Sequence, residues 1–144
     1  METLTTIHTS QSDAETAPIS RRALWTGRVM SALPALFLLV DAVGKFIKPA
    51  PVVEGTLQLG YPESVILGLG MVLLACTVLY IIPGTAILGA ILLTGYLGGA
   101  VATHVRVASP LFTHVLFPVY LAVLLWGGLY LRDERLRALI PLRR

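Results

Sequence analysis

The hydrophobic positions of this chain fall into long apolar runs separated by short polar segments. Between Ser64 and Val105 there is no Lys, Arg, Asp or Glu, and only the Pro83-Gly84 pair interrupts the run. A transmembrane helix needs roughly 20 apolar residues to cross a hydrocarbon core of about 30 Å, so this stretch predicts two membrane spans joined by a tight turn. Apolar runs on either side predict one further span each. The expected helices cover residues 22–48, 64–82, 84–105 and 111–131.

The link between the first two expected helices is the longest of the loops. Pro49 and Pro51 end the first helix because proline lacks the amide hydrogen that a helix needs. The Gly60-Tyr61-Pro62 sequence precedes the second helix, which leaves residues 52–59 for a short helix lying in the membrane interface. The predicted fold is therefore an all-α integral membrane four-helix bundle, with a short interfacial helix between helices 1 and 2.

The two ends of the chain are polar and predict tails outside the bundle. Residues 1–20 are rich in Thr, Ser, Glu and Asp and lack apolar periodicity, which predicts a disordered tail. Residues 21–135 form the expected transmembrane domain, and residues 136–144 a basic tail. Arginines gather at Arg21-Arg22 and again from Arg132 to Arg144. By the positive-inside rule, both termini are expected on the cytoplasmic side.

The composition excludes a soluble protein. The chain has 144 residues, of which 56% are hydrophobic and 13% charged, so it is expected to be one membrane domain. The net charge of +3 does not indicate a nucleic-acid partner, because the positive residues gather at the ends of the spans and set topology. Cys76 is the only cysteine, which excludes an intramolecular disulfide.

A cluster of polar residues is expected at the outer mouth of the bundle. An ionised Asp at the membrane centre costs about 2.5 to 3.5 kcal/mol, and Asp41 and Lys45 are four residues apart on one helical face, so they predict an ion pair. The third expected helix ends on the same side with His104 and Arg106, and the fourth begins there with His114. A pair that only locks helix packing, and ordinary polar helix ends, remain the alternatives.

The third expected helix also carries a glycine pair, Gly95 and Gly99, with GxxxG spacing. This spacing predicts close packing against another helix. In a functional alternative, the two glycines make room for a flat ligand against the backbone, with Tyr96 beside it. We predict no metal site, because the motifs HxxxH and HExxH and cysteines at ligand spacing are missing from the sequence, although spacing alone leaves haem ligation by His104 and His114 open.

Three motifs resemble those of the bacterial DoxX-like membrane proteins. They are Asp41-Ala42-Val43-Gly44-Lys45-Phe46, Leu59-Gly60-Tyr61-Pro62 and the block from Gly95 to Arg106. The resemblance runs from about Arg22 to Leu131, and Lys45, His104 and Arg106 occupy what look like signature positions. It implies a four-helix protein of the bacterial inner membrane. The wider DoxX group includes a subunit associated with thiosulfate oxidation by quinone, and other members are linked to oxidative-stress complexes.

The sequence leaves several functions open, and whether the protein is an enzyme is one of the open questions. The first interpretation is a non-catalytic accessory or assembly subunit of a membrane complex. The alternative is a quinone-binding or small-ligand-binding component of a membrane oxidoreductase, and a small anion transporter is a third. The expected partners are the lipid bilayer and another membrane or redox subunit, with no nucleic acid. Quinone is the candidate cofactor.

Overall fold

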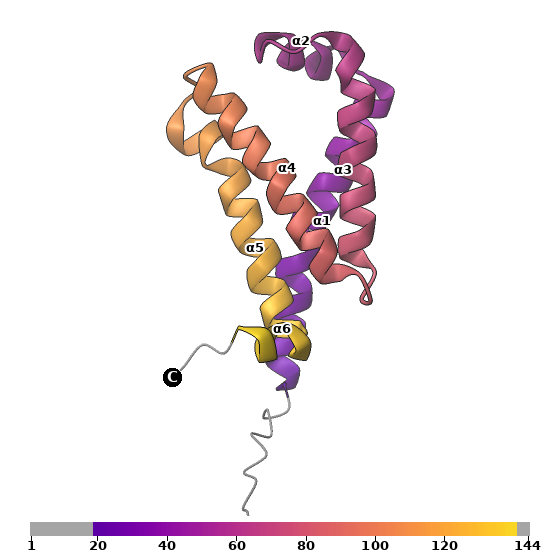
Figure 1. Cartoon of the computed structure of the whole chain (residues 1–144), viewed down its shortest axis with the longest axis vertical. Coiled ribbons are helices and arrows are strands. Elements are labelled where there is room, and N and C mark those ends of the chain that lie inside the picture. The colour runs from indigo at the N-terminus through magenta and orange to yellow at the C-terminus, as the bar shows by residue number, and fades with distance from the viewer. Residues whose placement is uncertain (1–18, 141–144) are drawn as a thin grey trace, which may run out of the picture.

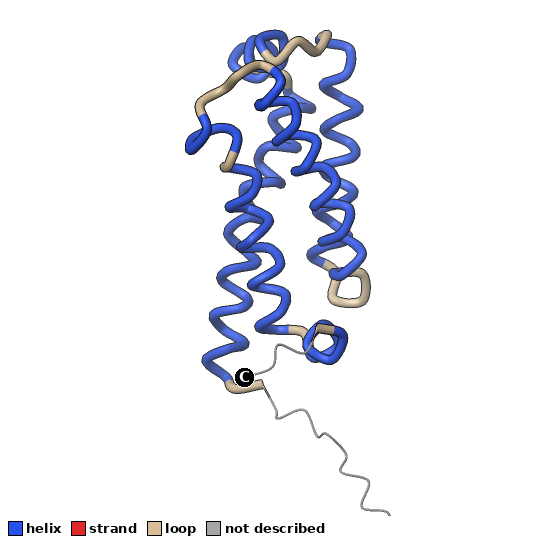
Figure 2. Tube along the Cα trace, turned by 60° about the vertical axis from the view of Figure 1, so that its left-hand side comes forward, coloured by secondary structure: helices blue, strands red, loops and turns tan. Residues whose placement is uncertain are grey.

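Helices make up almost all of the described part of the chain (Figure 2). The computed structural model describes residues 19–140, so most of the predicted N-terminal tail, and residues 141–144 of the predicted C-terminal tail, lie outside the described residues. The elements in chain order are α1 (Arg21–Ile47), α2 (Ala50–Gln58), η1 (Glu63–Val65), α3 (Ile66–Ile81), α4 (Ala86–Arg106), η2 (Leu111–Val115), α5 (Phe117–Arg132) and α6 (Glu134–Leu139). The predicted all-α class and the short helix between helices 1 and 2 are confirmed.

Four of the helical segments are long and apolar enough to cross a membrane. They are Arg21–Ile47, Glu63–Ile81, Ala86–Arg106 and Leu111–Arg132, within a few residues of the predicted spans. Only 28% to 33% of the residues in their most apolar windows are buried inside the protein, so most of the apolar side chains face outward. Leu33, Val40 and Met71, for example, are exposed. Lipid is the solvent for such a surface, and the chain is a multi-pass membrane protein.

The four long helices are arranged as a ring in which each contacts two others. Helix α1 packs against α3 and α5, and α4 packs against the same two helices. The core between them is formed by leucines and alanines with one tyrosine and one cysteine, including Leu38, Leu73, Leu93, Tyr80 and Cys76. Figure 1 shows α3 and α4 close together at their connecting turn and diverging toward the end where α2 lies. This divergence leaves the helices less tightly packed at the α2 end.

Close helix contacts are made through glycines that the sequence did not single out. A methyl group added at Gly27 of α1 would lie 2.8 Å from the backbone oxygen of Gly128 in α5. Gly89 of α4 touches the backbone of Tyr80 in α3 beside the connecting turn. The Tyr80 hydroxyl is buried, donates to the carbonyl of Leu125 at 2.8 Å and lies 2.9 Å from Ser31 Oγ. These contacts join α1, α3, α4 and α5 at the end away from α2.

The described chain begins and ends at the same end of the bundle, opposite α2 (Figure 1). Ser20 caps α1 by accepting a hydrogen bond from the amide of Ala23 at 3.2 Å. The short helix α6 was not predicted. Asp133 caps it by accepting from the amides of Arg135 and Leu136, and Leu136 is buried against the core. Helix α6 thus runs across residue 135, where the transmembrane domain was expected to end, and its capped turn places one buried leucine against the core.

Candidate functional site

A polar cavity of about 830 Å³ lies between α1, α4 and α5 at the end of the bundle where α2 is found. Residues of α2, from Pro51 to Gln58, line the cavity on one side and form its roof. Phe37 of α1 and Phe117 of α5 meet edge to face at 5.2 Å on its wall. Ligand pockets of proteins commonly measure about 300 to 1,000 Å³. The predicted site residues that line this cavity are Asp41, Lys45, Gly95, Tyr96, Gly99, His104 and His114.

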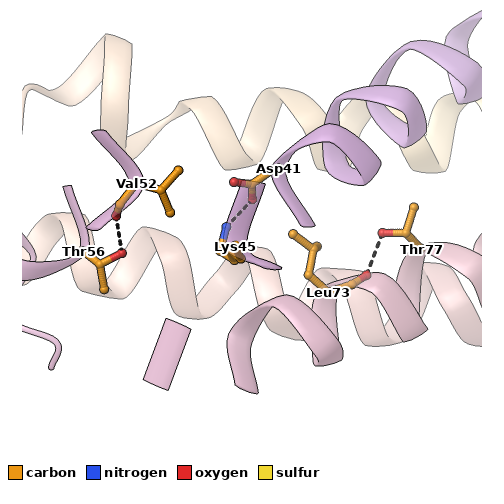
Figure 3. A network of polar contacts seen from close by, with 6 residues as sticks. All are labelled: Asp41, Lys45, Val52, Thr56, Leu73 and Thr77. Atoms are coloured by element: carbon orange, nitrogen blue, oxygen red, sulfur yellow. Dashed lines mark hydrogen bonds and ion pairs between the residues drawn. The ribbon is translucent and has the colours of Figure 1, made fainter. Parts of the chain in front are cut away.

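The ion pair predicted within helix 1 is present. Lys45 Nζ lies 2.6 Å from Asp41 Oδ2, one helical turn away on the same face of α1. Figure 3 shows this contact together with polar groups of α2 and α3. The side chain of Lys45 is only 14% exposed, whereas that of Asp41 is 36% exposed, toward the cavity. An ammonium group has three N–H donors, so Lys45 retains donors for a ligand while Asp41 fixes the position of the charge.

The aliphatic part of the Lys45 side chain packs against Gly70 of α3. A methyl group at Gly70 would lie 2.8 Å from Lys45 Cβ and 3.5 Å from the carbonyl oxygen of Ala42. The lysine stem therefore passes over α3 where α3 has no side chain. Sequence reasoning missed this role because nothing in the α3 run Ile66–Ile81 indicates which of its glycines faces α1.

Two histidines from different helices meet at the cavity wall. The rings of His104 and His114 have centroids 5.6 Å apart and an edge-to-face orientation. His104 Nδ1 lies 3.0 Å from Ser109 Oγ, and His114 Nδ1 lies 2.8 Å from Thr113 Oγ1. Each ring therefore uses Nδ1 for a neighbouring hydroxyl, and Nε2 is the nitrogen left to contact a ligand.

The predicted glycine pair lies at the cavity and not at a helix contact within this chain. A methyl group added at Gly95 or Gly99 would meet no atom of the described chain within 4 Å. The expected close packing is therefore not made here, because α4 diverges from α3 toward this end. Both glycines line the cavity, and the half-buried ring of Tyr96 lies next to them. The backbone of α4 is thus open to the cavity, as in the flat-ligand alternative.

Arg106 supports the roof of the cavity and does not line the cavity itself. Its Nη2 donates to the carbonyl oxygen of Leu59 at 2.7 Å, and its guanidinium carbon lies 5.7 Å from the centre of the Tyr61 ring. The Tyr61 hydroxyl is 2.9 Å from Thr103 Oγ1, also on α4. The end of α4 therefore holds the segment after α2 through two side chains. The sequence placed Arg106 at the correct end of the bundle but missed this long-range partner.

The side chains that line the cavity can bind a ligand through hydrogen bonds and charge. In the part of the chain that the structure describes, no three His, Cys, Asp or Glu side chains are grouped to hold a metal ion. The cavity instead offers one ammonium group, one carboxylate, two imidazoles and the phenols of Tyr61 and Tyr96, on largely apolar walls. Such a combination can orient an amphipathic molecule by its oxygen atoms and accommodate its apolar part.

The fold and the cavity together define a class: a small four-helix membrane protein with a polar cavity near one end of the bundle. Comparison with protein families identifies the family. Residues 29–128 match the model of the DoxX-like family, and the chain belongs to this family. No curated protein and no solved structure matches the chain.

Proposed function

We propose that this protein binds a flat, amphipathic, oxygen-bearing molecule of the quinone type in the cavity between α1, α4 and α5. The observation that carries the proposal is the placement of Lys45, His104 and His114 around one cavity of about 830 Å³. Two quinone oxygens can accept hydrogen bonds from an ammonium group and from an imidazole. The open backbone at Gly95 and Gly99 fits a ring that lies flat against α4.

In this proposal each polar residue has a distinct part. The Lys45 ammonium, positioned by Asp41, binds one ligand oxygen and stabilises negative charge that develops on it. Imidazole nitrogens of His104 and His114 bind the other oxygen and exchange protons with it. Arg106 takes no direct part, since it holds the roof. Electrons come from a partner redox subunit, which makes the protein a component of a membrane oxidoreductase.

The accessory or assembly role is the competing proposal. The same ion pair, between Asp41 and Lys45, then serves to fix α1, and the cavity is filled by lipid. The two functions differ in whether a specific small molecule occupies the cavity. They also differ in the effect of a side chain that fills the cavity at Gly99 without touching another helix.

We further propose that the protein lies in the inner membrane of a bacterium with both termini in the cytoplasm. Support comes from Arg21, Arg22 and Arg28 on α1 and from Arg132, Arg135 and Arg137, which gather at the end of the bundle opposite α2. The cavity then faces the periplasmic side. An alkaline phosphatase fused to the C-terminus should be inactive and one inserted in the 59–62 loop active; the reverse pattern contradicts this orientation.

The test of ligand binding uses two glycines of α4. Gly99→Leu places a side chain in the cavity, and Gly98→Leu is the matched control, because a methyl group at Gly98 also meets nothing within 4 Å and Gly98 does not line the cavity. Decylubiquinone binding to each purified variant is measured by calorimetry in mild detergent. Lipid extracts of the native protein are analysed in parallel by mass spectrometry.

We expect the native protein and Gly98→Leu to bind alike, and Gly99→Leu to lose at least about tenfold in affinity, or about 1.4 kcal/mol. Thermal stability of the two variants should be equal. Equal binding by all three proteins, or no binding and no copurified quinone in the native protein, would favour the accessory role.

A further inference from the structure

A second cavity, of about 310 Å³, lies at the opposite end of the bundle from the polar cavity. Arg28, near the start of α1, and Arg132, at the end of α5, both line it. The remaining lining residues are Ser31, Ala32, Ala35, Leu36, Leu39, Tyr80 and Ile81. No described acidic side chain lines this cavity, so its charge is positive.

Arg132, which lines this cavity, carries a buried donor with no acceptor among the described residues. Its Nε is buried and has no hydrogen-bond partner in the described part of the chain. The guanidinium carbon lies 5.4 Å from the centre of the buried Tyr80 ring, which fixes the group against α3. Neither ion pair that the structure shows among the described residues involves Arg28 or Arg132. Two arginines without an acidic partner among the described residues thus line one cavity, and their guanidinium groups favour an anionic oxygen there.

Apart from the hydroxyls of Ser31 and Tyr80, which bond to each other, the rest of the lining is apolar and continues along α1 toward the middle of the membrane. Ala32, Leu36 and Leu39 follow Arg28 at successive turns of the helix and line the same cavity. Ala32 and Leu36 are exposed on the outside of the bundle. The cavity is thus cationic at one end and apolar at the other. A phospholipid has the matching arrangement, with its phosphate at one end and acyl chains at the other.

We propose that this cavity is a binding site for an anionic phospholipid. The phosphate lies between the guanidinium groups of Arg28 and Arg132, and an acyl chain lies along Ala32, Leu36 and Leu39. Guanidinium groups bind phosphate through paired hydrogen bonds. A headgroup with its own positive charge is disfavoured beside two arginines, so phosphatidylglycerol should bind better than phosphatidylcholine, whose headgroup is a quaternary ammonium. The site is independent of the quinone-type ligand proposed for the other cavity.

The test compares lipid binding by native mass spectrometry of the detergent-solubilised full chain. The probes are phosphatidylglycerol and phosphatidylcholine with identical acyl chains. We expect the native protein to prefer phosphatidylglycerol, and Arg28→Gln and Arg132→Gln each to weaken its binding about fivefold. Arg22→Gln is the control, because Arg22 is exposed near the start of α1 and does not line the cavity. Arg28 is itself exposed, so its variant keeps the test valid if Arg132→Gln fails to fold.

Two further measurements separate a lipid from a free phosphate ion. Ala32→Phe fills the apolar part of the cavity and leaves both arginines in place, so it should weaken phosphatidylglycerol binding. Inorganic phosphate should neither raise the melting temperature nor compete with the lipid at equal concentration. The proposal is overturned if the two lipids bind equally, if Arg22→Gln weakens binding as much as Arg28→Gln, or if Ala32→Phe has no effect while free phosphate competes.

Discussion

The ion pair between Asp41 and Lys45 permits a quantitative test of how α1 is stabilised. Breaking a fully buried pair costs about 3 to 5 kcal/mol because one charge is left unpaired, whereas exposed pairs are worth about 0.2 to 1 kcal/mol. Here the side chain of Lys45 is 14% exposed and that of Asp41 is 36% exposed, with 2.6 Å between the charged atoms. We therefore expect Asp41→Asn and Lys45→Met each to lower the free energy of unfolding by about 2 kcal/mol. This loss is smaller than that for a fully buried pair because Asp41 is partly exposed in the polar cavity.

The double variant distinguishes a pair from two separate charges. Asp41→Asn combined with Lys45→Met should recover about 1 to 2 kcal/mol relative to the sum of the single losses. The assay is unfolding of the purified protein by SDS titration, followed by circular dichroism. Lys48 and Glu63 provide a matched control pair, since their charged atoms are 3.5 Å apart and their side chains are 33% and 58% exposed. Their coupling should be below about 0.5 kcal/mol. Simple additivity at Asp41 and Lys45 would refute the reasoning.

Two further predictions concern the contacts that surround the site and the core. Gly70→Ala places a methyl group 2.8 Å from Lys45 Cβ and should lower the free energy of unfolding by about 1 to 3 kcal/mol. Gly68→Ala, with open space around it, should change it by less than about 0.5 kcal/mol, so equal effects in SDS titration contradict the assigned contact. Tyr80→Phe removes the hydroxyl beside Ser31 and should lower the free energy of unfolding by about 1 to 3 kcal/mol. An unchanged midpoint of unfolding in the SDS titration argues against this hydrogen bond.

Features determined by local sequence could be predicted well. The four spans follow from the length of apolar runs, which the bilayer thickness fixes. The Asp41–Lys45 pair follows from helical spacing alone, since residues four apart share a face in any helix. Helix α6 was missed because six residues carrying several charges give no periodic signal, and its cap at Asp133 is recognisable only once the turn has formed.

Features that depend on how helices approach one another could not be predicted. The GxxxG spacing of Gly95 and Gly99 is the same whether the face packs on a helix or lines a cavity, and only the divergence of α4 from α3 decides between the two. The real close contact at Gly70 carries no sequence signal of its own. The acceptor of Arg106 lies 47 residues earlier in the chain, beyond the reach of any local pattern.

The open backbone at Gly95 and Gly99 makes the polar cavity adjustable. A side chain at either position would enter free space and press on no neighbouring helix. A larger residue at either position would reduce the volume of the cavity and change its shape, while the helix contacts that stabilise the bundle stay intact. Stability and activity often conflict at functional sites, but a methyl group at either of these positions meets no neighbouring helix. Single substitutions at these two positions of α4 would therefore change the shape of the proposed ligand site on an unchanged four-helix scaffold.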